Sequence, residues 1–342
     1  KEVGTKHSVF CNSGSSANLL MLQSLIELGE LQPGDAVVVP GLAWATDLAP
    51  VIQLGLSPVI CDINMNDLSV DLEDLERLFK SVKPKALILV SVLGLVPDMS
   101  SIVNLCNRHG VALLEDACES MASKHKGHTL GTFGKMSSFS TYFGHHISTI
   151  EGGFVCTDDF EVYEMLKAIR SHGWARDLSP NTKEKLKKQW GVSDFDSLYT
   201  FYYSGFNLRS TDLQAYMGLS QIDKLAPTSI VRSRNYMLYQ ENIKNDYWAP
   251  KIRKGDFVSN FAYPIVHPNR NVIAQKLQEN NVEVRPLICG SMVSQPFYKK
   301  KFKHRELKNC NVIDKFGMYI PNHPKMTPQD IIFVSQIINK YI

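Results

Sequence analysis

The stretch ALILVSV, residues 86–92, is an almost unbroken run of apolar and β-branched residues with the length of one buried strand. The longer apolar run that contains it, residues 86–96, is too short to cross a bilayer. Three more runs have the same character: DAVVVP (35–40), SPVICD (57–62) and VALLED (111–116). Continuous apolar strands of this kind are typical of a parallel sheet that is buried on both faces.

Segments with apolar residues at helical spacing separate these runs, at 16–29, 69–82 and 99–110. Ser69 is a candidate N-cap for the second segment, and Gly110 is a candidate C-cap for the third. The alternation of strands and helices predicts an α/β fold, in which helices cover both faces of a mostly parallel sheet. Ligands of such sheets bind at the carboxyl ends of the strands.

The pattern changes in the second half of the chain. Residues 176–197 are polar and predict an exposed insertion, after which an amphipathic helix begins with Ser210 or Thr211 as its cap. Beyond Pro227 we expect a long helix, short strands and a last helix from residue 327. We therefore predict a large α/β domain over residues 1–226 and a smaller α+β domain over residues 227–342.

Composition excludes several classes of protein. The 37 Lys and Arg against 34 Asp and Glu give a net charge of +3, which is too mild to indicate a nucleic-acid partner. The seven cysteines are scattered without C-x-x-C spacing, so we expect neither a disulfide framework nor a metal site. No membrane span and no signal peptide are expected. A cytoplasmic protein is the prediction.

The stretch NSGSSANLL, residues 12–20, places small residues directly before a helical pattern. The N–H groups at a helix start point toward open space, where the helix dipole favours an anion. Gly14 and Ser15 are therefore candidates to bind a phosphate. An ordinary serine-capped helix start is the alternative.

Polar and aromatic residues also follow two of the predicted strands. Asp116 ends the run VALLED, where an unpaired acid has no structural purpose but could hold a positive charge on a ring nitrogen. Glu119 follows three residues later. Both acids could instead cap a following helix. Trp44 comes after another strand and could stack on a flat ring or belong to the core.

The segment SSFSTYFGHHISTIEGG, residues 137–153, contains Ser140 and the adjacent histidines His145 and His146. A lone histidine is more often a hydrogen-bonded structural residue than a catalyst. If the predicted sheet forms, however, the end of this segment's strand lies beside the ends that carry Trp44 and Asp116.

These motifs, together with GFNLRSTDLQAYMGLSQIDKL (205–225), resemble the pyridoxal phosphate-dependent sugar aminotransferases of the DegT/DnrJ/EryC1/StrS family. The resemblance runs from residue 8 to the last helix. It implies the fold-type I aminotransferase architecture, a large sheet domain followed by a smaller C-terminal α+β domain, and pyridoxal or pyridoxamine 5′-phosphate as the cofactor.

In that family a lysine that holds the cofactor covalently precedes a Glu-Gly-Gly or Asp-Gly-Gly turn. Counting back from Glu151 places His145 at the lysine position. FGHHISTIEGG resembles the family's sugar 3-dehydratase branch, which implies a noncovalent cofactor and His145 as the acid/base. The implied reaction removes the C3 hydroxyl of an NDP-4-keto-6-deoxyhexose, with GDP-4-keto-6-deoxy-D-mannose as the preferred substrate and L-glutamate as amino donor. Colitose and O-antigen synthesis would be its setting.

The resemblance also assigns cofactor contacts. It implies that Gly14, Ser15 and Ser140 bind the phosphate and that Trp44 stacks on the ring. Asp116 would keep the ring nitrogen protonated, and Glu119 would lie near the ring hydroxyl; no metal ligand is implied.

Three further residues are assigned by the same resemblance. Asn207 matches an asparagine that reaches the cofactor phosphate from the partner subunit, so a homodimer with shared sites is expected. Arg209 and Arg285 are candidates for substrate binding, because arginine suits bidentate contact with phosphate. His146 could support His145 or only fill the turn. The basic stretch 299–308 could meet a nucleotide diphosphate, or form a solvated face.

Two other functions stay open. One is an aminotransferase that uses a lysine from elsewhere, such as Lys135, and the other is a noncatalytic sensor or scaffold with the same fold. Thr141 and Phe143 stand where related dehydratases often have an aromatic residue and a proline, so the pocket is expected to differ. Residues 176–205 hold no cysteine, which argues against an iron–sulfur enzyme.

Overall fold

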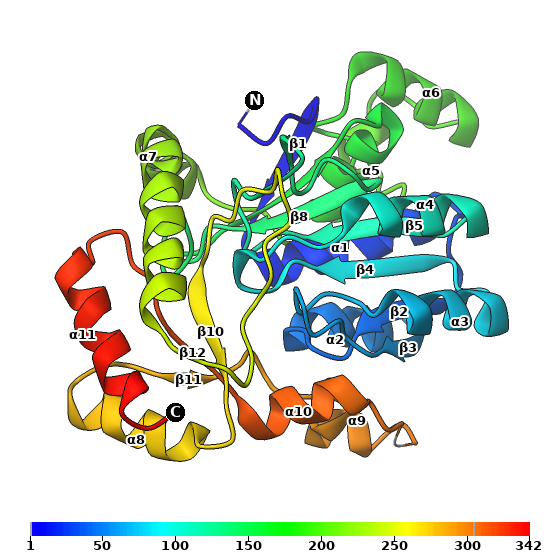
Figure 1. The fold of residues 1–342 in the computed structure, drawn as a ribbon. Helices are drawn as coiled ribbons and strands as arrows, with labels where there is room; N and C mark the ends of the chain where they lie inside the picture. Colours follow the sequence, from blue (N-terminus) through cyan, green and yellow to red (C-terminus); the bar gives the residue numbers. More distant parts are fainter. Residues whose placement is uncertain (1, 304) are drawn as a thin grey trace.

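The computed structural model describes residues 2–303 and 305–342, and its centre is a seven-stranded sheet (Figure 1). In spatial order the strands are β1 (His7–Cys11), β9 (Gly153–Thr157), β8 (Met136–Ser140), β5 (Ala112–Asp116), β4 (Ala86–Val90), β2 (Ala36–Pro40) and β3 (Ser57–Cys61). The pairs from β8 to β3 are parallel, whereas β9 is antiparallel to both β8 and β1. The predicted mostly parallel sheet is confirmed, and all five residues of β4 are buried.

Helices of the N-terminal half pack around this sheet (Figure 1). They are α1 (Gly14–Glu27), α2 (Ala45–Gln53), α3 (Leu72–Val82), α4 (Met99–His109) and α5 (Phe160–Arg170). Gly110 ends α4 with φ of 64°, as predicted for a left-handed C-cap. The predicted cap Ser69 is wrong: Asp71 caps α3 by accepting a hydrogen bond from the Asp74 N–H.

Short elements lie in the connections of this half and before the long helix that follows it. They are η1 (Val92–Gly94), β6 (Lys124–His125), β7 (His128–Thr129), α6 (Pro180–Trp190) and η2 (Asp196–Tyr199). The next helix, α7 (Asp212–Asn242), begins at Thr211, whose side chain accepts from the Gln214 N–H in a capping box. It continues through Pro227, so the change of pattern there does not end a helix. The domain division at residue 226 stays a prediction.

The C-terminal part contains a second, antiparallel sheet in the order β10 (Ala262–Val266), β12 (Gly317–Pro321), β11 (Arg285–Pro286). Its other elements are α8 (Arg270–Glu279), η3 (Met292–Ser294), α9 (Pro296–Lys299), α10 (Lys308–Phe316) and α11 (Pro328–Asn339). Helix α11 packs against α7 and α8 (Figure 1). Asp62, after β3, accepts from the N–H groups of Asn309 and Cys310, which joins α10 to the large sheet.

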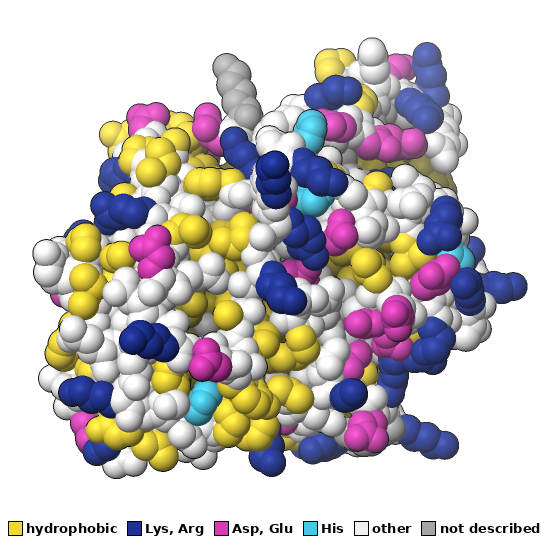
Figure 2. Space-filling view, in the orientation of Figure 1, with side chains coloured by type: hydrophobic (Ala, Val, Ile, Leu, Met, Phe, Trp, Pro, Cys, Tyr) yellow, Lys and Arg dark blue, Asp and Glu magenta, His cyan; other side chains and the backbone are white. Residues whose placement is uncertain are grey.

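One continuous cluster of buried apolar residues extends from Val9 on β1 to Ile338 on α11, so the two sheets share a core. Figure 2 shows lysine and arginine side chains spread over the viewed face rather than gathered in one patch. No helix among the residues that the structure describes is long and apolar enough to cross a membrane.

Candidate active site

A cavity of about 480 Å³ opens at the carboxyl ends of β4, β5 and β8. Eight of the ten predicted site residues line it, from both halves of the chain: Gly14, Ser15, Trp44, Asp116, Glu119, Ser140, His145 and Arg285. Residues of parallel strands that are far apart in sequence thus meet at one edge of the sheet, as expected for this class of fold.

The start of α1 forms one wall of the cavity. Ser13 caps this helix and accepts from the Ser16 N–H at 3.1 Å, while the first N–H groups of a helix have no acceptor within it. A Cβ atom on Gly14 would lie 2.8 Å from Ser140 Cβ and 2.9 Å from Cys118 Sγ. Only glycine therefore lets the helix start approach the end of β8 so closely, and the resulting cradle suits an anion.

Asp116 lies at the last position of β5 and is 6% exposed. Its Oδ1 accepts from the Cys118 N–H at 2.8 Å, and its Oδ2 accepts from Asn18 Nδ2 at 2.7 Å. Residues 117–123 form turns rather than a helix, so the alternative that Asp116 and Glu119 cap a helix is wrong. The acid is held by its neighbours and faces the cavity.

Glu119 and Trp44 lie on other walls of the cavity. Glu119 accepts from the Leu93 N–H at 2.8 Å, and burial raises the pKa of its carboxyl to about 7, with Asp116 adding to the shift. Trp44 follows β2 as the N-cap residue of α2 and is 56% exposed. The alternative of a core tryptophan is therefore wrong, and the indole is open to a flat ligand.

His145 lies on the connection between β8 and β9. Its N–H donates to the Tyr142 carbonyl at 2.9 Å, and its ring packs on Phe261 with centroids 5.1 Å apart. Nδ1 is buried, and no hydrogen-bond partner for it exists within the described chain. Burial lowers the pKa of His145 to about 4 although Asp116 opposes the shift, so the imidazole is neutral at pH 7 and free to accept a proton.

A model of the DegT/DnrJ/EryC1/StrS aminotransferase family matches residues 1–339. The chain belongs to this family. Two curated relatives are named GDP-4-keto-6-deoxy-D-mannose 3-dehydratase. The one from Escherichia coli O55:H7 is 31% identical over 99% of this chain and 89% of its own, and the one from Yersinia pseudotuberculosis is 32% identical over 98% and 88%.

Solved structures support the same relationship. E. coli GDP-4-keto-6-deoxy-D-mannose-3-dehydratase with bound hydrated PLP has a TM-score of 0.89 at 30% identity, over 98% of this chain and 88% of that one. A mutant of GDP-4-keto-6-deoxymannose-3-dehydratase with bound GDP-perosamine has a TM-score of 0.90 over 98% of this chain and 89% of that one. A structure of an enzyme of the same name with a trapped PLP-glutamate geminal diamine has a TM-score of 0.88 over 98% and 89%; each is 30% identical. The PLP aminotransferase fold predicted for this member of the family is confirmed.

In this member of the family, no lysine lines the cavity within the described residues. Lys135 precedes β8 at the opposite end of the strand from Ser140 and forms an ion pair with Glu30. The aminotransferase alternative that relied on Lys135 therefore has no support from the geometry.

His146 points away from the cavity. It is buried, and its Nε2 lies 3.0 Å from the Ser259 carbonyl oxygen. Burial lowers its pKa to about 3, so it too is neutral at pH 7. The prediction that it fills the turn agrees with these contacts.

Asn207 and Arg209 do not line the cavity. Both are exposed on the strand-like segment before α7, where Asn207 is bridged to Ser171 and Arg209 to Cys11. Their predicted roles toward a partner subunit and a substrate stay predictions. Arg285 lies on β11 beside Tyr319 of β12 and forms an ion pair with Glu283 at 2.5 Å.

The remaining sequence predictions fall near the cavity or away from it. Phe143 lines the mouth of the cavity and is 67% exposed, whereas Thr141 is buried and its Oγ1 forms a 2.5 Å hydrogen bond with Thr149 Oγ1. In the basic stretch 299–308, Arg305 binds the Asp74 carboxylate at 2.6 Å, and His304 lies outside the described residues. This stretch does not line the cavity.

Sequence reasoning missed several cavity residues, among them Ser13, Asp47, Phe261 and Tyr319. Ser13 was part of the quoted NSGSSANLL motif, and its place as the helix cap was a usable signal. Asp47 is an acid on the buried side of α2, which also was a signal. Phe261 and Tyr319 look like ordinary members of apolar strands.

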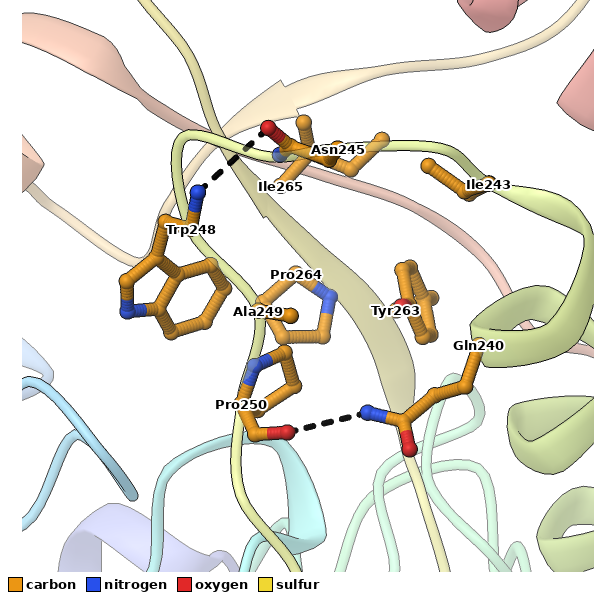
Figure 3. A pocket seen from close by; sticks show the side chains of 9 residues that line it. All are labelled: Gln240, Ile243, Asn245, Trp248, Ala249, Pro250, Tyr263, Pro264 and Ile265. Carbon is orange, nitrogen blue, oxygen red and sulfur yellow. Dashed lines mark hydrogen bonds between the residues drawn. The ribbon is translucent and has the colours of Figure 1, made fainter.

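A smaller hollow of about 200 Å³ lies where the end of α7 meets β10 (Figure 3). Gln240 spans part of it by donating to the Pro250 carbonyl at 3.0 Å. No acid, lysine, arginine or histidine is among the described residues that line it.

Proposed function

We propose that this chain is a nucleotide-sugar 3-dehydratase that removes the C3 hydroxyl of GDP-4-keto-6-deoxy-D-mannose, with L-glutamate as amino donor. The observation that carries the proposal is His145: a neutral histidine, rather than a lysine, faces Asp116 across a family cofactor site. The near full-length similarity to named 3-dehydratases supports it. The bound GDP-perosamine and PLP-glutamate adduct of those structures support the GDP sugar and glutamate.

The residues of the cavity fit pyridoxal or pyridoxamine 5′-phosphate. The glycine cradle of α1 with Ser15 and Ser140 would hold the phosphate, and the open indole of Trp44 would lie on the ring. Asp116 would face the ring nitrogen and keep it protonated. When bound, the cofactor supplies an electron sink that makes loss of the C3 hydroxyl possible.

In the family, the lysine binds the cofactor covalently and moves protons; His145 would keep only the proton transfer. Imidazole forms no stable covalent link to the cofactor but can move a proton, and its buried Nδ1 has no other partner in the described chain. His145 would take up a proton in the cavity and return one to the departing C3 oxygen of the sugar. The product would be a 3-deoxy-4-keto sugar without an amino group; the nitrogen would leave as ammonia, and L-glutamate would become 2-oxoglutarate as it replaces that nitrogen.

The predicted substrate and subunit contacts complete the proposal. Arg285 would bind the substrate from the cavity wall, and Arg209 from the exposed segment before α7. Asn207 would reach the cofactor phosphate of a partner subunit in a homodimer, as its exposed position permits. We place the enzyme in the cytoplasm, in colitose synthesis for a lipopolysaccharide O-antigen.

Mass spectrometry of the products tests this function. The protein is incubated with pyridoxamine phosphate, L-glutamate and either GDP-4-keto-6-deoxymannose or its CDP counterpart. We expect loss of the C3 oxygen from the GDP sugar without gain of a sugar amine. A stable aminosugar would instead support transamination, and failure to bind the cofactor would support a noncatalytic protein.

A further inference from the structure

Asp47 is a fully buried acid in the wall of the cavity, in the first turn of α2. Both carboxyl oxygens have partners. Oδ2 accepts from the Trp44 N–H at 2.9 Å, and Oδ1 accepts from Asn18 Nδ2 at 3.0 Å. One carboxyl group therefore connects the backbone of Trp44 to the side chain of a residue on α1.

Asn18 extends this connection to Asp116. Its Nδ2 donates both to Asp47 and to Asp116 Oδ2, the latter at 2.7 Å, and the side chain is 1% exposed. The Asn18 Oδ1 is buried, and no hydrogen-bond partner for it exists among the described residues. A chain of buried contacts thus runs from Trp44 through Asp47 and Asn18 to Asp116, across α2, α1 and β5.

We propose that Asp47 is a positioning residue, which holds Trp44 and, through Asn18, Asp116 in the places where they face the cavity. The inference rests on the proposed function only in taking the cavity as the cofactor site. Asp47 would act through these neighbours and would not itself react.

Electrostatics favours the neutral form of Asp47. Burial raises its pKa well above the ordinary range, and the nearby Asp116 carboxylate raises it further. Two charged carboxylates that share one amide would repel each other. The other titratable groups around Asp47 are Glu119, which raises its pKa further, and the thiols of Cys118 and Cys289, whose pKa values are raised by burial.

The test compares Asp47→Asn with Asp47→Ala in the full chain, with pyridoxamine 5′-phosphate as the probe and no sugar present. Affinity is measured by calorimetry, and the pH midpoint of the bound-cofactor absorbance is measured by titration. We expect Asp47→Asn to weaken binding, but less than Asp47→Ala does, because an amide keeps one of the two acceptor atoms that contact Trp44 and Asn18. In Asp47→Ala we expect affinity to fall about tenfold or more. Its midpoint should move to lower pH, because a displaced Asp116 stabilises a protonated ring nitrogen less.

Asp67→Ala is the matched control. Asp67 is also a buried acid, but it accepts from Ser69 Oγ at 2.6 Å and pairs with Arg253 far from the cavity lining. We expect this variant to melt at lower temperature with unchanged affinity and midpoint. A merely structural role for Asp47 would give the same result for Asp47→Ala.

Three results would overturn the inference. Asp47→Ala could bind with wild-type affinity and midpoint, or Asp47→Asn could lose affinity as strongly as Asp47→Ala does. If Asp47→Ala does not fold, Asp47→Asn alone decides the matter: wild-type affinity and midpoint in this variant would contradict the positioning role, because one of the two acceptor contacts is lost. A wild-type protein that binds the cofactor but releases no 3-deoxy sugar would refute the proposed function and leave this inference standing; one that binds no cofactor would refute both.

Discussion

The connection between β8 and β9 has a cavity side, occupied by His145, and a core side, occupied by His146. Burial depresses the pKa of both rings, to about 4 and about 3. In both rings the buried Nδ1 has no hydrogen-bond partner in the described chain. Their surroundings differ in two respects: His146 Nε2 lies 3.0 Å from a backbone carbonyl oxygen, whereas the ring of His145 lines the cavity. Acid/base chemistry therefore depends on access to the cavity, and not on a shifted pKa or an unpaired ring nitrogen alone.

The largest effect should come from His145→Asn, which removes the proton-transfer group and keeps a polar side chain. We expect the rate of C3 deoxygenation to fall by about 10²–10⁴-fold, the usual contribution of a general acid/base. The measurement is the initial rate of 3-deoxy sugar release by mass spectrometry. A variant that retains more than half of the wild-type rate would remove His145 from the mechanism.

His145→Lys should restore the family's covalent chemistry at this position. We expect the lysine to retain the cofactor covalently after borohydride reduction, as an added mass on the intact protein, and dehydration to be lost. The wild type treated in the same way is the control and should release its cofactor on denaturation. If the variant dehydrates at the wild-type rate, histidine is not what selects the reaction.

His146→Ala should affect stability more than activity. The change leaves the Ser259 carbonyl without its partner in a buried place, which costs about 1–3 kcal/mol of unfolding free energy. We expect a lower midpoint in urea and an almost unchanged rate per folded molecule. A loss of activity as large as that of His145→Asn would erase the distinction between the two sides of the turn.

The two histidines should also make the fold sensitive to acid. Below pH 6.5, the ordinary pKa of histidine, both imidazoles are protonated in the unfolded chain. In the folded chain His145 stays neutral down to about pH 4 and His146 down to about pH 3. Stability from this source is complete above pH 6.5 and falls as the pH falls. Urea unfolding across this range should show a shallower decline for His146→Ala. The contribution of Glu119 to the pH dependence of stability has the opposite sign, because its pKa is raised to about 7 in the folded chain. This contribution is the same in the wild type and in His146→Ala.

Lys135→Ala should have the smallest effect. The exposed ion pair with Glu30 contributes about 0.2–1 kcal/mol at most, and it lies at the end of β8 away from the cavity. We expect wild-type rates and wild-type cofactor affinity. A large loss of either would revive a role for a lysine and contradict the assignment of the cavity.

Local patterns in the sequence were sufficient to predict the sheet and the meeting of Trp44, Asp116, Ser140 and His145, because parallel strands bring their carboxyl ends together. The contacts that hold these residues could not be predicted from local pattern. Asn18 reaches Asp116 across 98 positions. No periodicity encodes such a contact, because it depends on how helices dock on the sheet.

Local sequence pattern also fails to predict which residues near the second sheet line the cavity. Phe261 and Tyr319 enter the cavity from strands and loops whose apolar pattern predicts only burial. The misassigned cap at Ser69 has a simpler cause: Asp71, two positions later, also accepts hydrogen bonds well, and pattern alone does not decide between two adjacent caps.

A hydrogen bond between the hydroxyls of Thr141 and Thr149, 2.5 Å apart, joins the two ends of the connection that carries His145. Thr149 also donates to the Glu151 carbonyl. Phe143 and Ile150, nearer the tip, are exposed. Evolutionary selection can therefore act separately on the exposed residues and on the threonine pair. Mutations at Phe143 or Ile150 can reshape the mouth of the cavity and change which sugar enters. The hydrogen bond between Thr141 and Thr149 meanwhile keeps His145 in place. Substrate specificity can therefore evolve here without loss of the proton-transfer group.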